Sequence, residues 1–176
     1  TQFNAFSSPI IILSSVVLSL AGVFLGIVIS RNDFVIIMTM IGIISLAGIV
    51  VNNAIVLVDY TNLIRKRKRA ELELDETTLI SNEDFKASVI EGGKTRLRPV
   101  LLTAITTILG LFPLASGLNI NFFSLVSDWD PQIFFGGDNV IFFKPMSLAI
   151  IYGLTFATFL TLVVVPIMYY SIYRFK

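Results

Sequence analysis

Long apolar runs alternate with polar segments along the chain, and these runs set the expected architecture. They cover residues 9–29, 35–64, 100–118 and 145–173. A helix needs about 20 predominantly apolar residues to cross a bilayer, and each run is close to that length or longer. The pattern therefore predicts an all-α membrane protein with four transmembrane helices.

The polar segment between the second and third runs, residues 65–98, carries most of the positive charge. It opens with five consecutive basic residues, Arg65 to Arg69, and holds nine of the thirteen Lys and Arg residues. Seven acidic residues share the segment, which favours contact with anionic lipid over nucleic-acid binding. Because loops rich in Lys and Arg stay in the cytoplasm, we expect a cytoplasmic segment. Arg174 and Lys176 then fall on the same side, so both ends of the chain are predicted to be cytoplasmic.

A short amphipathic helix is expected inside this loop. Ser81 to Asp84 has the sequence of a capping box, and Phe85 and Val89 stand four residues apart on one face of the helix that follows. We expect this helix to lie along the cytoplasmic membrane surface, with its apolar face toward the lipid.

These signals divide the chain into three regions. Residues 1–64 hold the first two membrane helices, residues 65–98 form the cytoplasmic loop with its surface helix, and residues 99–176 hold the last two membrane helices. Within the last region, residues 119–144 form an aromatic-rich periplasmic loop. The sequence Gly136-Gly137-Asp138-Asn139 predicts a turn there, and we expect either a small hairpin or a re-entrant loop.

Small residues recur at helical spacing in the first two runs. Gly22 and Gly26 form a Gly-x-x-x-Gly pair, and Ser45 and Gly48 lie on one stripe of the second run. Small side chains let the backbones of two membrane helices approach closely. We therefore expect these residues to form helix-packing faces.

Polar side chains inside the second and third runs are the candidate functional groups. Asn52 and Asn53 are adjacent carboxamides in an otherwise apolar run, and Thr103 is the first of three threonines within five residues. Polar groups inside a span are costly, and they either bond to a neighbouring helix or serve a function. Both interpretations of the asparagines stay open at this point.

Composition excludes several classes of protein. Hydrophobic residues make up 55% of the chain, charged residues only 14%, and the mean hydropathy is +0.85. The chain has no cysteine and no histidine, which excludes a disulfide framework, a thiolate nucleophile, an imidazole base and the usual zinc or copper sites. Since no nucleophile–base pair stands out either, we expect neither an enzyme nor a bound metal or organic cofactor.

Motifs in three parts of the chain closely resemble those of the resistance-nodulation-division (RND) efflux permeases of the hydrophobe/amphiphile efflux type. They are Gly48 to Tyr60, Arg96 to Thr103, and Ile108 to Leu114, in the family's order and spacing. The resemblance covers essentially the whole chain. It implies the last four helices of a twelve-helix permease, and the absence of a starting Met and of a signal peptide agrees with a fragment.

The resemblance also implies a biological setting. Family members export hydrophobic or amphiphilic compounds from the bacterial inner membrane and are driven by the proton gradient. They form homotrimers that work with a periplasmic adaptor and an outer-membrane channel. The implied partners of this chain are therefore membrane lipid, the missing N-terminal half, a homotrimer, an adaptor and a channel, without nucleic acid.

The same resemblance assigns residues to a proton relay. Asn53 matches the family's own asparagine, and Asn52 stands where many drug exporters have a lysine that pairs with aspartates. Thr103 and Arg96 match polar positions of the eleventh helix that are associated with the relay. An amide lacks the positive charge of lysine. The charged form of a carboxyl group beside Asn52 is therefore less favoured, and its pKa is raised. We expect a simpler relay, with one aspartate from the missing half bonded by Asn52 or Asn53 and Thr103.

Two alternatives to this exporter are considered. The chain could be a non-transporting four-helix membrane scaffold or subunit that binds partners through its small-residue faces. It could also belong to a protein- or lipid-exporting member of the same superfamily, which shares the helical core. The upstream sequence would decide between them.

Overall fold

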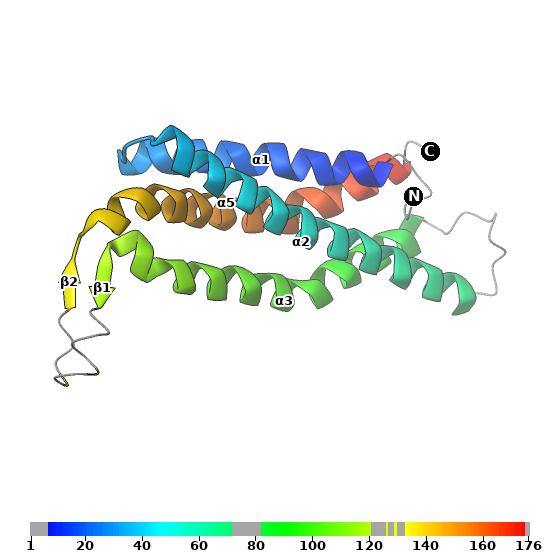
Figure 1. Cartoon of the computed structure of the whole chain (residues 1–176). Helices are drawn as coiled ribbons and strands as arrows, with labels where there is room; N and C mark the ends of the chain where they lie inside the picture. Colours follow the sequence, from blue (N-terminus) through cyan, green and yellow to red (C-terminus); the bar gives the residue numbers. More distant parts are fainter. Residues whose placement is uncertain (1–6, 72–81, 121–125, 127–128, 130–132, 175–176) are drawn as a thin grey trace.

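The computed structural model describes residues 7–71, 82–120, 126, 129 and 133–174. The described elements are four long helices and one short pair of strands, shown in Figure 1. They are α1 (Ser7–Ser30), α2 (Ile36–Glu71), α3 (Asn82–Ser116), β1 (Leu118–Ile120), β2 (Ile133–Phe135) and α5 (Asp138–Arg174). All four helices are long and apolar enough to cross a membrane, as expected from the apolar runs.

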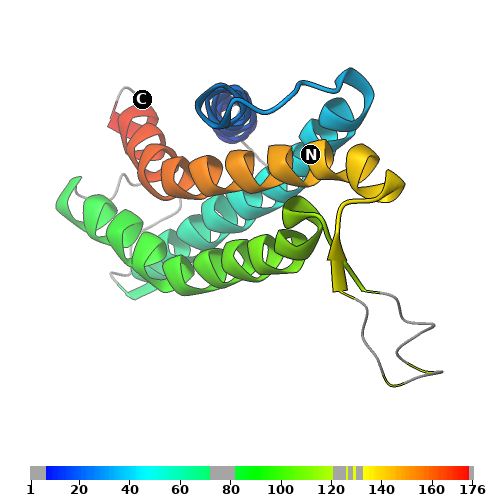
Figure 2. The same ribbon diagram turned by 90° about the vertical axis from the view of Figure 1, so that its left-hand side faces the viewer.

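Helices α2 and α5 each pack against the other three helices, and the contacts that α5 makes with α1, α2 and α3 are the most extensive. Helix α1 also packs against α2, and α2 against α3, whereas α1 and α3 lie on opposite sides (Figures 1 and 2). The main buried cluster combines side chains from all four helices. Its members are Val23, Leu46, Val50, Ala104, Ala149, Leu154 and Ala157.

The glycine pair of α1 lies where α1 meets α5. A Cβ atom on Gly22 would be 2.5 Å from the Cβ atom of Phe156, and a Cβ atom on Gly26 would overlap the side chain of Tyr152. Larger side chains at these two positions would push the helices apart, so the glycines permit the close approach of α1 to α5.

The small residues of α2 have different surroundings. Ser45 is exposed, and a Cβ atom on Gly48 would meet no atom within 4 Å among the described residues. Their expected packing role is therefore not fulfilled by α1, α3 or α5. It stays a prediction for a surface that these helices do not provide.

The cytoplasmic helix expected from the capping box is not separate from the third membrane helix. Helix α3 runs without a break from Asn82 through Pro99 to Ser116, and the ribbon changes direction part-way along it (Figure 1). Phe85 faces the protein instead of lipid: it is fully buried and stacks on Tyr169 and Tyr170 of α5. This packing holds the first turns of α3 against α5, and Pro99 lies inside the helix although it cannot donate a backbone hydrogen bond.

The loop between α3 and α5 begins and ends as an antiparallel pair, with Leu118 opposite Phe135. Most of residues 121–132 lie outside the described residues. Gly136 and Gly137 have φ values of 100° and 115°, a backbone conformation that favours glycine. They join β2 to α5, which starts at Asp138 and not near Pro145 as expected. The predicted turn therefore lies at the helix start and not at the tip of the hairpin.

The ends of the four helices alternate between the two ends of the bundle, as expected for four successive membrane crossings. The start of α1, the ends of α2 and α5 and the start of α3 lie together at one end, and the α1–α2 turn and the strands lie at the other (Figure 1). Trp129 and Phe135, on the strand side, are 89% and 73% exposed. Aromatic side chains of this kind are typical of the membrane interface.

Candidate functional site: a polar seam between α2 and α3

The contact between Tyr60 of α2 and Arg96 of α3 fixes the register of these two antiparallel helices. The guanidinium carbon of Arg96 lies 4.3 Å from the centre of the Tyr60 ring, in a cation–π contact. Seven residues, almost two helical turns, bring a side chain back to nearly the same stripe after about 10 Å. One such step inward from the contact leads to Asn53 on α2 and to Thr103 on α3.

Counted from that contact, Asn53 and Thr103 lie at a similar depth on two neighbouring helices. The buried cluster supports this depth, because it joins Val50 of α2 to Ala104 of α3. Asn53 is half-buried, whereas Asn52, turned by about 100°, is exposed on the outer surface of α2. We define the polar seam as Asn53 and Thr103, with Asn52 at its rim.

The other described helices do not cover the polar seam. Thr103 is exposed, and a Cβ atom on Gly110, seven residues further along α3, would meet no atom within 4 Å. Nearer the start of α3, by contrast, a Cβ atom on Gly92 would lie 2.9 Å from Oγ1 of Thr61. The helices are therefore in close contact near Thr61 and Gly92, whereas Thr103 and Gly110 lie on an exposed stripe of α3.

The threonine hydroxyls of α3 donate to carbonyls of their own helix. Oγ1 of Thr103 lies 3.0 Å from the carbonyl oxygen of Val100, and Oγ1 of Thr107 lies 2.8 Å from that of Thr103. This is the usual way to satisfy a hydroxyl in an apolar span. A hydroxyl oxygen that donates in this way can still accept a hydrogen bond from another group.

The carboxamides have no such partner. In the described part of the chain, neither Asn52 nor Asn53 makes a side-chain hydrogen bond, so the expected bond to Thr103 is not formed. Each carboxamide offers two donor hydrogens and an accepting oxygen. Inside a membrane, unsatisfied polar groups of this kind cost several kcal/mol each by order of magnitude. The seam therefore fits a polar group supplied from outside these helices.

Arg96 lies away from the two carboxamides. It is about 10 Å from Thr103 along α3, toward the start of that helix, and its guanidinium covers Tyr60. In this position the side chain joins α2 to α3 near the end of α2. The structure thus does not bring the four expected relay residues into one cluster.

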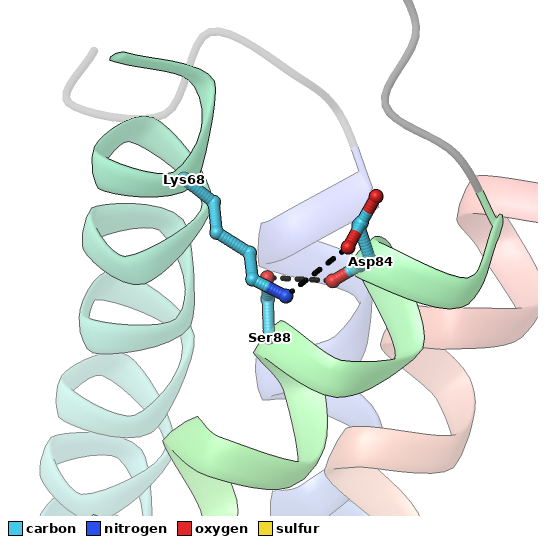
Figure 3. A network of polar contacts seen from close by, with 3 residues as sticks. All are labelled: Lys68, Asp84 and Ser88. Atoms are coloured by element: carbon cyan, nitrogen blue, oxygen red, sulfur yellow. Dashed lines mark hydrogen bonds and ion pairs between the residues drawn. The ribbon is translucent and has the colours of Figure 1, made fainter. Parts of the chain in front are cut away.

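The contacts at the end of α2 include residues that sequence reasoning missed. The hydroxyl of Tyr169 donates to Oδ1 of Asn62 over 2.5 Å, which joins α5 to α2. Nζ of Lys68 lies 3.4 Å from Oδ1 of Asp84, which joins α2 to α3 (Figure 3). Within α3, Oγ of Ser88 donates to the backbone carbonyl of Asp84. The only sequence signal for them was the Tyr169-Tyr170 pair near the end of an apolar helix.

Comparison with known proteins decides the family. The model of the AcrB/AcrD/AcrF family matches residues 1–119, which include the whole polar seam. The chain belongs to this family of RND permeases. No solved structure gives a significant match to this RND permease chain.

Curated relatives extend the family match over almost the whole chain. The swarming motility protein SwrC of Bacillus subtilis is 36% identical over 99% of the chain, which corresponds to 14% of that protein. The nickel and cobalt resistance protein CnrA of Cupriavidus metallidurans is 32% identical over 88% of the chain and 11% of its own length. A multidrug resistance protein, MdtC of Erwinia tasmaniensis, is 27% identical over 95% of the chain and 13% of its own length. This RND permease chain thus spans about a seventh or less of these relatives.

Proposed function

We propose that this chain is the C-terminal membrane part of a proton-driven export permease and that its polar seam is one wall of the proton pathway. The observation that carries the proposal is that, among the described residues, the half-buried carboxamide of Asn53 makes no side-chain hydrogen bond in the middle of an apolar span, with the exposed Asn52 beside it and Thr103 at a similar depth on α3. Polar side chains that face the interior of a membrane protein are typical of ion and proton pathways.

The chemistry of the seam suits a carboxyl group from the rest of the permease. Asn53 can donate N–H groups to the ionised carboxylate, and the oxygens of Asn53 and Thr103 can accept the O–H of the protonated acid. The seam can therefore hold both protonation states, with different hydrogen bonds in each. A shift of α2 against α3 that favours one set of bonds would couple proton uptake to a conformational change.

We expect the substrate to bind in a part of the permease outside these four helices. Hydrophobic or amphiphilic compounds are our first proposal, supported by the name of the MdtC relative. The name of the CnrA relative makes metal cations the competing class. A homotrimer in the bacterial inner membrane, with a periplasmic adaptor and an outer-membrane channel, completes the proposal.

The test uses the protein as its gene encodes it, in cells that lack other exporters. We expect Asn53→Ala and Thr103→Ala to reduce efflux of an amphiphilic dye at least tenfold while the protein level in the membrane is unchanged. The matched control is Thr155→Ala, which removes an exposed threonine of α5 that also donates to its own helix, over 2.7 Å. Its efflux should equal that of the unsubstituted protein.

Other outcomes separate the alternatives. Normal efflux in both seam variants would contradict the assigned pathway. Export of nickel in place of the dye, with the same loss in the variants, would keep the pathway and change the substrate class. A protein that exports neither would favour a scaffold.

A further inference from the structure

A groove at the extracytoplasmic end of the bundle carries acidic and basic side chains that the proposed proton pathway does not use. It has a volume of about 260 Å³ and lies between the α1–α2 turn and the first turns of α5. Its polar lining is Asn32, Asp33 and Lys144, and Val35, Ile141, Pro145 and Leu148 form its apolar lining.

The groove lies at the level where the membrane spans begin and end. Helix α1 ends at Ser30 and α2 begins at Ile36, directly beside it. Large apolar side chains around it point outward: Ile36, Ile37 and Ile141 are 67%, 70% and 69% exposed. On a transmembrane helix such a surface faces acyl chains, so the groove opens where acyl chains meet lipid headgroups.

The two charges in the groove are not neutralised by each other. Among the described residues, neither Asp33 nor Lys144 belongs to an ion pair with an N···O distance of 4.0 Å or less. The amide nitrogen of Asn32 lies 3.2 Å from the hydroxyl of Tyr152, which fixes this side of the groove on α5. A ligand that carries one positive and one negative group would complement both charges at once.

We propose that this groove binds the headgroup of a zwitterionic aminophospholipid from the outer leaflet of the membrane. Lys144 binds the phosphate, and the carboxylate of Asp33 accepts hydrogen bonds from the primary ammonium group. The apolar lining receives the glycerol and the first acyl carbons. An anionic lipid without an amine would place a negative charge near Asp33, which weakens its binding. A lipid with a quaternary amine has no N–H group to donate to Asp33, so it lacks this hydrogen bond.

Native mass spectrometry of the detergent-purified, full-length protein tests this site. The protein is titrated with phosphatidylethanolamine, phosphatidylglycerol and phosphatidylcholine that have identical acyl chains. We expect the ethanolamine lipid to bind most tightly. Lys144→Gln and Asp33→Asn should each raise its dissociation constant about fivefold, which corresponds to the loss of one exposed ion pair. Asp33→Asn should also remove the preference for the ethanolamine lipid over the glycerol lipid.

Two matched controls change the same charges outside the groove. Arg31→Gln and Asp138→Asn remove a base and an acid at the same end of the bundle, and neither residue lines the groove. Lipid binding should be unchanged in both. An equal loss in controls and groove variants would mean a general charge effect, and tighter binding of phosphatidylglycerol by the unsubstituted protein would mean an anionic-lipid surface. Either result overturns the proposal, and neither bears on the proton pathway.

Discussion

Two adjacent carboxamides on α2 have different surroundings, and a contact almost two turns away explains the difference. The stacking of Arg96 on Tyr60 sets which stripe of α2 faces α3. Asn53 shares that stripe and Asn52 does not. Asn52, which departs from the lysine expected from the family resemblance, is thus the more exposed of the two carboxamides.

Single glycines also decide how close the helices come. We predict that Gly26→Ala lowers stability by about 1–3 kcal/mol, because its methyl group would overlap the side chain of Tyr152. Thermal unfolding of the purified protein in detergent measures this loss. Gly93→Ala is the control: its Cβ atom would meet nothing within 4 Å, and alanine favours a helix over glycine by about 1 kcal/mol. Equal behaviour of the two variants would contradict tight packing of α1 on α5.

Whole elements were predictable from the sequence to the extent that local composition determines them. Apolar length alone located all four membrane helices. It could not show that Phe85, in the first turn of α3, is buried against Tyr169 and Tyr170, because these lie more than 80 residues further along. The orientation of Asn53 is likewise set by a contact between two helices. Such contacts leave no periodic signal in either segment.

The cytoplasmic part of α3 depends on one aromatic side chain. We predict that Phe85→Ala destabilises this part by about 3–5 kcal/mol, since a fully buried ring between two tyrosines is lost. Hydrogen exchange of residues 82–98 should become faster, while exchange in α1 stays the same. Lys86→Ala, at an exposed neighbouring position, is the matched control and should leave exchange unchanged. Faster exchange in both variants would show that this segment is held by charge and not by the ring.

For the whole molecule, the placement of elements predicts which side of the membrane each end faces. Cysteine can be introduced singly, because the chain has none of its own. In a full-length background without other cysteines, we predict that Asp138→Cys reacts with an impermeant maleimide in intact cells. Lys66→Cys should react only after the cells are permeabilised. The opposite pattern would invert the topology and place the lipid groove on the cytoplasmic side.

The extensive packing of α5 has a consequence for how the protein is made. Helix α5 contacts all three other helices, yet the ribosome synthesises it after them. Until it enters the bilayer, Gly22, Gly26 and the fully buried Phe85 lack their partners. Contacts of α2 with α1 and α3 can form earlier, but the packing faces around Gly22, Gly26 and Phe85 stay incomplete until α5 is in place. Insertion of α5 is therefore the step that completes the buried core of this segment.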